Sequence, residues 1–238
     1  MTDEILTDLL SGNDEHVESL PGDYFDGVIE GQQPSVVSIC CSDSRVSQEG
    51  MWNVDRPGEV FTPSNIGNQV WDADAGEKIV DGSVCYPIHH CGTDAVAVVG
   101  HTGCGAVTAA YEVARGADAP RPLGVAKWIE LLAPVIREAL ADDAVDADAD
   151  GAPRGVDEDL LIDQLVEYNV DAQVEFLLEA PEIPDDVAVY GFVYDFEGAY
   201  GDDRGRAYLV NADGATEPSA IADRVPERHH AAVNSLLY

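Results

Sequence analysis

Short, uninterrupted runs of apolar residues recur along the chain, separated by longer stretches with helical periodicity. The two clearest runs are SVVSIC at 35–40 and AVAVVG at 95–100. Runs of this kind are typical of strands that are buried on both faces of a parallel sheet. EVFTP at 59–63 predicts another strand. Segments 187–196 and 205–211 carry valine and tyrosine on either side of a Gly/Asp-rich turn, and they predict a hairpin.

The helical stretches complete an alternating pattern of strands and helices. In chain order they cover 2–11, 13–30, 75–91, a segment ending at Gly116, 123–141, 160–179 and a short closing helix from 218. Pro87 is expected to kink its helix or end it early, and the acidic segment 141–159 predicts a loop. The alternation favours an α/β fold: a mainly parallel central sheet flanked by helices, with an antiparallel edge strand. We expect one domain over 1–238.

Charge adds an unusual surface to this fold. The chain has 46 acidic residues against 12 basic ones, a formal net charge of −34, and only two lysines. Such a surface repels itself in dilute buffer, and salt screens that repulsion. The composition therefore predicts a salt-adapted protein, and the lack of a basic patch excludes nucleic acid as a partner. No apolar run is long enough for a membrane span, and the acidic N-terminus is unlike a signal peptide, so we expect a cytoplasmic location.

Candidate chemistry lies just beyond the two apolar runs. Cys41, Asp43 and Arg45 follow the first run, and His101 and Cys104 follow the second. Neighbouring parallel strands end at the same sheet edge, so the two cysteines and the histidine can converge there. Two thiolates and an imidazole form a known ligand set for a catalytic zinc. The alternatives are a buried His and Cys in a strand–helix corner, and an ordinary turn with a surface salt bridge.

The adjacent cysteines require a choice between them. Residues next to each other in a strand face opposite sides, so Cys40 and Cys41 cannot both face the site. Cys41 lies beside the turn and is the expected ligand, whereas Cys40 is expected in the core. Asp43 can approach the metal or its water, and the guanidinium of Arg45 can fix where that carboxylate points.

These residues together resemble the β-class carbonic anhydrases, which carry a C-x-D-S-R turn and, about sixty residues later, an H-x-x-C-G turn. Here CSDSR occupies 41–45 and HTGCG occupies 101–105. The similarity runs from about Gln32 to Gly116 and resumes weakly at 189–200. The resemblance implies a zinc-dependent enzyme that hydrates carbon dioxide to bicarbonate and a proton, in a salt-adapted, haloarchaeal-like member of the family.

The resemblance also implies roles for individual residues. Zinc would be held by Cys41, His101 and Cys104, and the Asp43–Arg45 pair would be catalytic. Gln32 and the backbone amide of Gly103 would contact substrate. Family members form an obligate dimer whose N-terminal helices, here 1–30, embrace the partner, so we expect a homodimer or a higher homo-oligomer.

One departure and two rival functions remain. Ser64 in SNIGN replaces an arginine that helps some members bind an inhibitory bicarbonate, so that regulatory site is not implied. The same zinc site could instead hydrolyse CS₂ or COS. A non-catalytic zinc protein, with Asp43 or another cysteine as a permanent fourth ligand, is the rival from a different class.

Overall fold

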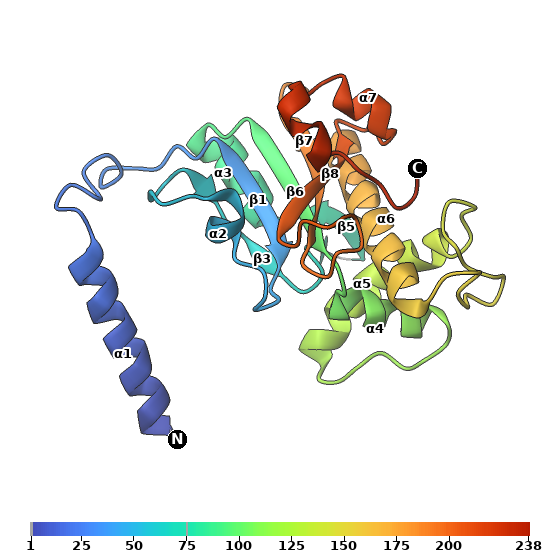
Figure 1. The fold of residues 1–238 in the computed structure, drawn as a ribbon. Coiled ribbons are helices and arrows are strands. Elements are labelled where there is room, and N and C mark those ends of the chain that lie inside the picture. The colour runs from blue at the N-terminus through green and yellow to red at the C-terminus, as the bar shows by residue number, and fades with distance from the viewer. Residues whose placement is uncertain (1, 75) are drawn as a thin grey trace.

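A single central sheet organises the structure, a computed structural model that describes residues 2–74 and 76–238 (Figure 1). The strand order is β2-β1-β6-β7-β8, with β3 also paired to β1. All pairs are parallel except β7–β8, which is antiparallel at the edge. The predicted fold class is therefore confirmed. The strands are β1 (Val36–Cys41), β2 (Val60–Phe61), β3 (Ser64–Asn65), β6 (Ala95–His101), β7 (Ala188–Asp195) and β8 (Arg206–Ala212).

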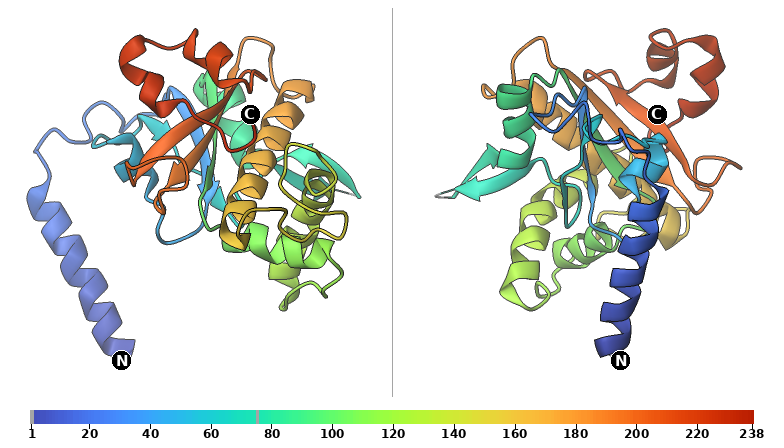
Figure 2. Two further views of the ribbon diagram at one scale, coloured as in Figure 1. Left: turned by 45° about the vertical axis from the view of Figure 1, so that its right-hand side comes forward. Right: turned by 90° about the vertical axis from the view of Figure 1, so that its left-hand side faces the viewer.

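Helices cover both faces of the sheet (Figure 2). The long helices α4, α5 and α6 lie on one face, and the short helices α2 and α7 lie against the other. The helices are α1 (Thr2–Ser19), α2 (Gln48–Trp52), α3 (Gly82–Cys91), α4 (Gly105–Ala114), α5 (Leu123–Ala139), α6 (Glu158–Glu179) and α7 (Pro218–Ala222), with a 3₁₀ turn at Glu227–Ala232.

Helix α6 lies unusually close to the sheet because two glycines face it. A Cβ at Gly100 would lie 2.8 Å from side-chain carbons of both Val166 and Val170, and one at Gly191 would lie 2.7 Å from Val170. Glycine at these positions lets the helix backbone approach the strands. The first half of α6 is thereby held beside the end of β6.

The N-terminal region differs from its prediction. Instead of two helices, α1 runs through Gly12 to Ser19, and consecutive turns occupy 21–30. Glycine in a helix interior costs only about 1 kcal/mol relative to alanine, so it need not end the helix. Proline removes a backbone donor, and Pro21 follows closely on the point where the helix does end. The helix projects away from the sheet (Figure 1).

A projecting hairpin replaces the first part of the helix predicted over 75–91. Strands β4 (Trp71–Asp74) and β5 (Glu77–Val80) pair antiparallel, and α3 begins only at Gly82, after an N-cap at Asp81. Pro87 lies inside α3 without ending it.

Both lysines of the chain contact this hairpin. Lys78 places its Nζ 3.8 Å from the ring centroid of Trp71, and Lys127 places its Nζ 2.6 Å from Oδ1 of Asp72. The first contact joins the two strands of the hairpin, and the second ties the hairpin to α5. The two contacts together fasten the hairpin at its base.

The remaining segments follow their predictions more closely. The acidic segment 141–159 is largely irregular, although Val145 is fully buried and α6 begins slightly early, at Glu158. The closing region forms α7 and the 3₁₀ turn. Among the described residues, no helix has both the length and the apolar character that crossing a bilayer requires.

Candidate metal centre

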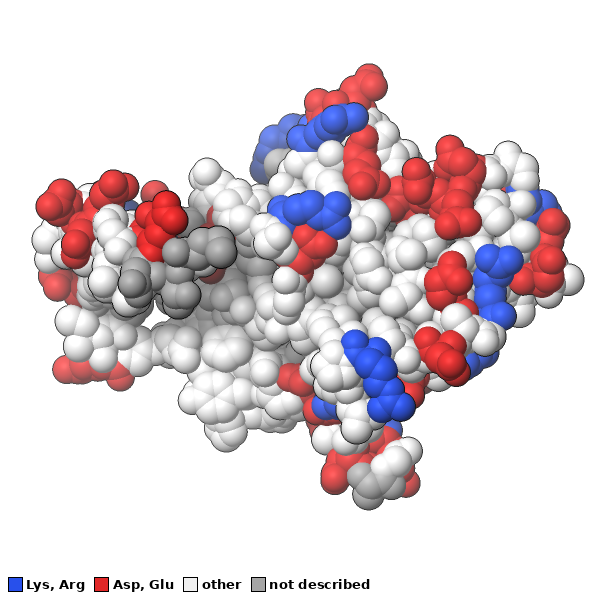
Figure 3. Space-filling view, turned by 90° about the horizontal axis from the view of Figure 1, so that it is seen from below, with Lys and Arg blue, Asp and Glu red and all other residues white. Residues whose placement is uncertain are grey.

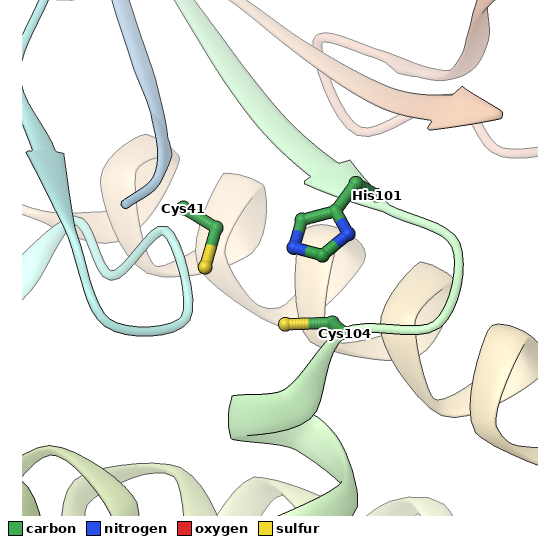
Figure 4. A group of neighbouring side chains, drawn as sticks. All are labelled: Cys41, His101 and Cys104. Carbon is green, nitrogen blue, oxygen red and sulfur yellow. The ribbon is translucent and has the colours of Figure 1, made fainter. Parts of the chain in front are cut away.

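Three buried side chains converge where two parallel strands end. Cys41 is the last residue of β1, His101 is the last residue of β6, and Cys104 caps the N-terminus of α4. The parallel register pairs Cys40 with Val99, which brings the two strand ends level. The candidate ligand atoms of Cys41, His101 and Cys104 all lie within 4.8 Å of one another (Figure 4).

The turn between His101 and Cys104 requires glycine. Gly103 has φ +59°, in the left-handed region that side chains disfavour. A Cβ at this position would also lie 2.6 Å from Oε1 of Glu197. The turn can therefore reverse the chain within two residues and return Cys104 to the histidine.

The donor set fits zinc, and the histidine is prepared for it. Nδ1 of His101 lies 2.8 Å from the carbonyl oxygen of Thr102. A carbonyl can only accept, so Nδ1 carries the proton and Nε2 presents its lone pair. Nε2 is buried and has no hydrogen-bond partner among the described residues. A buried acceptor without a partner is costly, and a metal would satisfy it.

The two cysteine sulfurs influence each other's ionisation. A hydrogen bond from Cys104 lowers the pKa of Cys41, against the opposing effect of burial. The same bond raises the pKa of Cys104 well above its ordinary value. One sulfur is thus a ready thiolate, and a cation that binds both would release the remaining proton.

Asp43 lies beside this cluster but is held by Arg45. Nε and Nη2 of Arg45 donate to the two carboxylate oxygens at 2.9 and 2.7 Å. These hydrogen bonds hold the pKa of Asp43 well below its usual range, so the group is a carboxylate. Its Oδ2 lies 3.9 Å from Nε2 of His101. The carboxylate therefore borders the cluster without joining it.

Arg45 is fixed in turn by two further contacts. Its Nη2 donates to the carbonyl of Gly103 at 3.2 Å. Its guanidinium lies 4.5 Å from the ring centroid of Phe196, and that ring stacks on His101 with centroids 5.6 Å apart. One aromatic side chain thus touches both the candidate ligand and the arginine of the pair.

The two predicted substrate contacts lie in different surroundings. The Gly103 amide is near the cluster and donates to Oδ1 of Asp163 at 2.8 Å. Gln32 is exposed and lines a hollow with Gly31, Ser35 and Val60, which includes no member of the cluster. The resemblance places that glutamine at a subunit interface, which a single chain does not contain.

Asp163 and Phe196 contact this site although no sequence motif marked them. Burial raises the pKa of Asp163 to about 7. Asp163, Glu167, Asp171 and Glu175 recur every four residues, but Glu175 is exposed, so this spacing does not mark Asp163 as a site residue. Phe196 carries no signal either, because it reaches the site only through the geometry of the loop after β7.

Comparisons with known proteins agree with this geometry. The family model described as carbonic anhydrase matches residues 36–200. A carbonic anhydrase from Emericella nidulans is 32% identical over 149 residues, covering 62% of this chain and 57% of the relative. One from Pseudomonas aeruginosa is 31% identical over 178 residues, covering 73% of this chain and 74% of the relative.

A solved structure extends the likeness over most of the fold. The Coccomyxa β-carbonic anhydrase in complex with acetazolamide superposes with a TM-score of 0.67 at 25% identity, covering 94% of this chain and 95% of that one. The chain spans only 57% of the relative from Emericella nidulans and 61% of one from Synechococcus elongatus. The family match over most of the sequence, the shared fold and the cluster of two cysteines and a histidine together show that the chain belongs to the β class of the carbonic anhydrases.

Proposed function

We propose that the protein is a zinc lyase that catalyses the reversible hydration of carbon dioxide to bicarbonate and a proton. Cys41, His101 and Cys104 would hold the zinc. The observation that carries this proposal is the state of Asp43, the nearest candidate for a fourth ligand, whose two oxygens both bond to Arg45. Three ligands with a fourth position left open are typical of catalytic zinc, whereas structural sites are closed.

The chemistry follows from how these residues are held. Zinc would act as a Lewis acid that lowers the pKa of a bound water and so supplies the nucleophile near neutral pH. The Asp43 carboxylate would accept a hydrogen bond from the attacking group and orient it toward carbon dioxide. Arg45 would keep that carboxylate turned aside from the metal. Gln32 of a partner subunit is a proposed contact for substrate, whereas the N–H of Gly103, the other predicted contact, already donates to Asp163.

Measurement of carbon dioxide hydration tests the function directly. The purified chain would be loaded with zinc at molar salt, and proton release would be followed by stopped flow with a pH indicator. Activity should rise in proportion to zinc content up to one ion per chain. A fully loaded protein without hydration activity would overturn the proposal, and parallel assays with CS₂ and COS would then identify the rival substrate.

We infer that a second copy of the chain covers α1. Its exposed apolar residues, spaced three and four apart along one side, include Ile5, Leu6, Leu9, Leu10 and Val17. The body beside α1 is largely uncharged and hollowed on the face shown in Figure 3. An isolated amphipathic helix is marginal in water without a surface to pack on. The family resemblance, in which N-terminal helices embrace the partner, supports a homodimer or larger homo-oligomer.

Sedimentation tests this assembly. Replacing Leu9 by aspartate should shift the protein toward the monomer, because a charge would enter the apolar interface. Asp14→Asn, also in α1, removes a charge from the helix and serves as the control. An unchanged sedimentation coefficient in the Leu9 variant would contradict α1 as the interface.

Two environmental properties complete the proposal. Salt adaptation is supported by the net charge of −34 and by acidic side chains that are scattered over the surface rather than gathered in one patch (Figure 3). A cytoplasmic location is supported by the five cysteines, all of which are free thiols in the structure, since disulfides are rare in cytosolic proteins.

A further inference from the structure

A single peptide group connects His101 to a buried carboxylate on another element. The peptide between Thr102 and Gly103 accepts from Nδ1 of His101 through its carbonyl, at 2.8 Å. The same peptide donates from its N–H to Oδ1 of Asp163, also at 2.8 Å. Carboxylate, peptide and imidazole therefore form one continuous chain of hydrogen bonds that ends at the free Nε2.

The position of Asp163 is set by the packing of α6. The residue is only 3% exposed, and the N–H of Gly103 is the one hydrogen-bond donor recorded for it within the described part of the chain. Close approach of α6 to Gly100 brings the first turns of the helix beside the loop. Burying a carboxyl group is costly unless the group is hydrogen-bonded. The Gly103 amide supplies that hydrogen bond to Asp163.

Hydrogen bonds in a chain polarise one another, which strengthens each member. A carboxylate at one end makes the peptide carbonyl a better acceptor for Nδ1–H, and Nε2 becomes a better electron donor. Partners that orient a metal-bound histidine in this way typically change metal affinity by about 10- to 100-fold. Most such partners contact the imidazole directly, whereas here a backbone peptide intervenes.

We propose that Asp163 is a positioning residue for the metal centre, acting on His101 through the Thr102–Gly103 peptide. The inference rests on the proposed function in that His101 is taken to be a zinc ligand. Gly103 also links Asp163 to Arg45, because the Gly103 carbonyl accepts a hydrogen bond from Arg45. Asp163 thus holds the turn that orients both the histidine and the Asp43–Arg45 pair.

Three variants of the full chain, loaded with zinc at molar salt and held above pH 7 so that Asp163 is ionised, test the proposal. Asp163→Leu removes the acceptor, and Asp163→Asn keeps an acceptor oxygen without the charge. Glu179→Gln removes a charge from an exposed residue at the far end of the same helix and serves as the control. Zinc affinity would be measured against a competing chelator, with the folded fraction checked by circular dichroism.

The expected order of zinc affinity is wild type, then Asp163→Asn, then Asp163→Leu. The leucine variant should bind zinc about tenfold more weakly, the lower end of the range for direct partners, and the asparagine variant about threefold more weakly, since a neutral acceptor is roughly half as strong. Exchange of the Gly103 amide proton, followed by NMR, should accelerate in the leucine variant. Glu179→Gln should match the wild type in both measurements.

Unchanged zinc affinity in a folded Asp163→Leu protein would overturn the proposal. If the Asp163→Leu variant does not fold, the Asp163→Asn variant alone tests the proposal. A zinc affinity of that variant within about twofold of wild type would then overturn the proposal. Wild-type protein that binds zinc but does not hydrate carbon dioxide would instead refute the proposed function, while the affinity ranking would still test Asp163.

Discussion

Cys40 and Cys41 are adjacent in sequence and face opposite sides of β1. Cys40 is fully buried with Ala97 and Val99 on the face covered by α2, and burial raises the pKa of its thiol to about 12. Cys41 belongs to the cluster at the other face, where neighbouring donors favour the thiolate. The alternation of a strand therefore separates an inert thiol from a reactive one by a single residue.

Substitution of the cysteines should separate these roles. Cys41→Ala and Cys104→Ala should reduce the zinc content from about one ion per chain to almost none, because two-thirds of a three-ligand site cannot hold the metal. Cys40→Ala should keep its zinc. Metal analysis of the three purified variants checks this, and full zinc in the Cys41 variant would disprove the ligand assignment.

Arg45 has no contact with the three candidate ligands in this structure except through other residues. It holds Asp43 by two hydrogen bonds and is itself held by Gly103 and Phe196. Arg45→Ala should therefore free the carboxylate to turn toward the metal and close the fourth position. Carbon dioxide hydration should fall by about 10- to 100-fold while zinc content stays at the wild-type level.

Stopped-flow assays beside metal analysis distinguish this outcome from loss of the metal. Arg154→Ala, which removes an arginine paired with Asp146 in the acidic loop, is a matched control and should retain full activity. A fully active Arg45 variant would show that Asp43 does not need its partner.

At the scale of an element, helix α6 carries a row of acids, of which Asp163 and Glu167 are buried and Asp171 is half-buried. Asp163, Glu167 and Asp171 follow one another at intervals of four residues. Each acid accepts hydrogen bonds from a different segment. Asp163 accepts from the Gly103 amide, and Glu167 accepts from the Tyr200 hydroxyl and the Leu236 amide. Asp171 accepts from the side-chain amide of Asn211. The row ties α6 to the loop after β6, to the C-terminal segment and to β8.

These acids of α6 should make the stability of the fold depend on pH. Burial raises the pKa of Asp171 to about 7 from an ordinary value of 3.8, so between these values the folded state holds a proton that the unfolded state has released. Stability should therefore fall as pH rises through this window. Asp171→Asn should flatten the fall by up to about 1.4 kcal/mol per pH unit, the limit for one proton.

Denaturant unfolding of zinc-loaded protein at several pH values measures this slope. Glu179→Gln, two turns later on the same helix and exposed, is the control and should leave the slope unchanged. Equal slopes for wild type and the Asp171 variant would mean that this carboxyl group titrates normally in the fold.

Sequence patterns predicted those elements whose signal is local. The runs at 35–40 and 95–100 became β1 and β6, and the motifs at their ends converge because parallel strands share an edge. The β4–β5 hairpin was missed because its strands are only four residues long and rich in charged residues, which leaves no clear apolar pattern. Phe196 was missed because only the folded loop brings its ring to Arg45.

At the scale of the whole molecule, charge opposes the fold that these contacts stabilise. Acidic side chains outnumber basic ones nearly fourfold, at 46 against 12. Their mutual repulsion destabilises the compact state in dilute buffer. At 1 M salt the Debye length falls to about 3 Å, which leaves only near neighbours unscreened.

Thermal unfolding across a salt series should reveal this dependence. The midpoint should rise steadily up to molar potassium chloride, by about 2–4 °C for each kcal/mol of repulsion removed in a chain of this size. Sucrose at matched osmolality is the control, because it does not screen charge. A flat or falling series in salt would contradict salt adaptation.

The hairpin at residues 71–80 has a practical consequence for chemical modification. The only side-chain amines of the protein are Lys78 and Lys127, and both meet this hairpin. Lys127 is engaged by Asp72, whereas burial lowers the pKa of Lys78 and increases its nucleophilic fraction. Of the two lysines, acylating reagents should therefore modify Lys78 first, and coupling to a solid support through lysine should attach every molecule by the same corner, which gives an immobilised layer with one orientation.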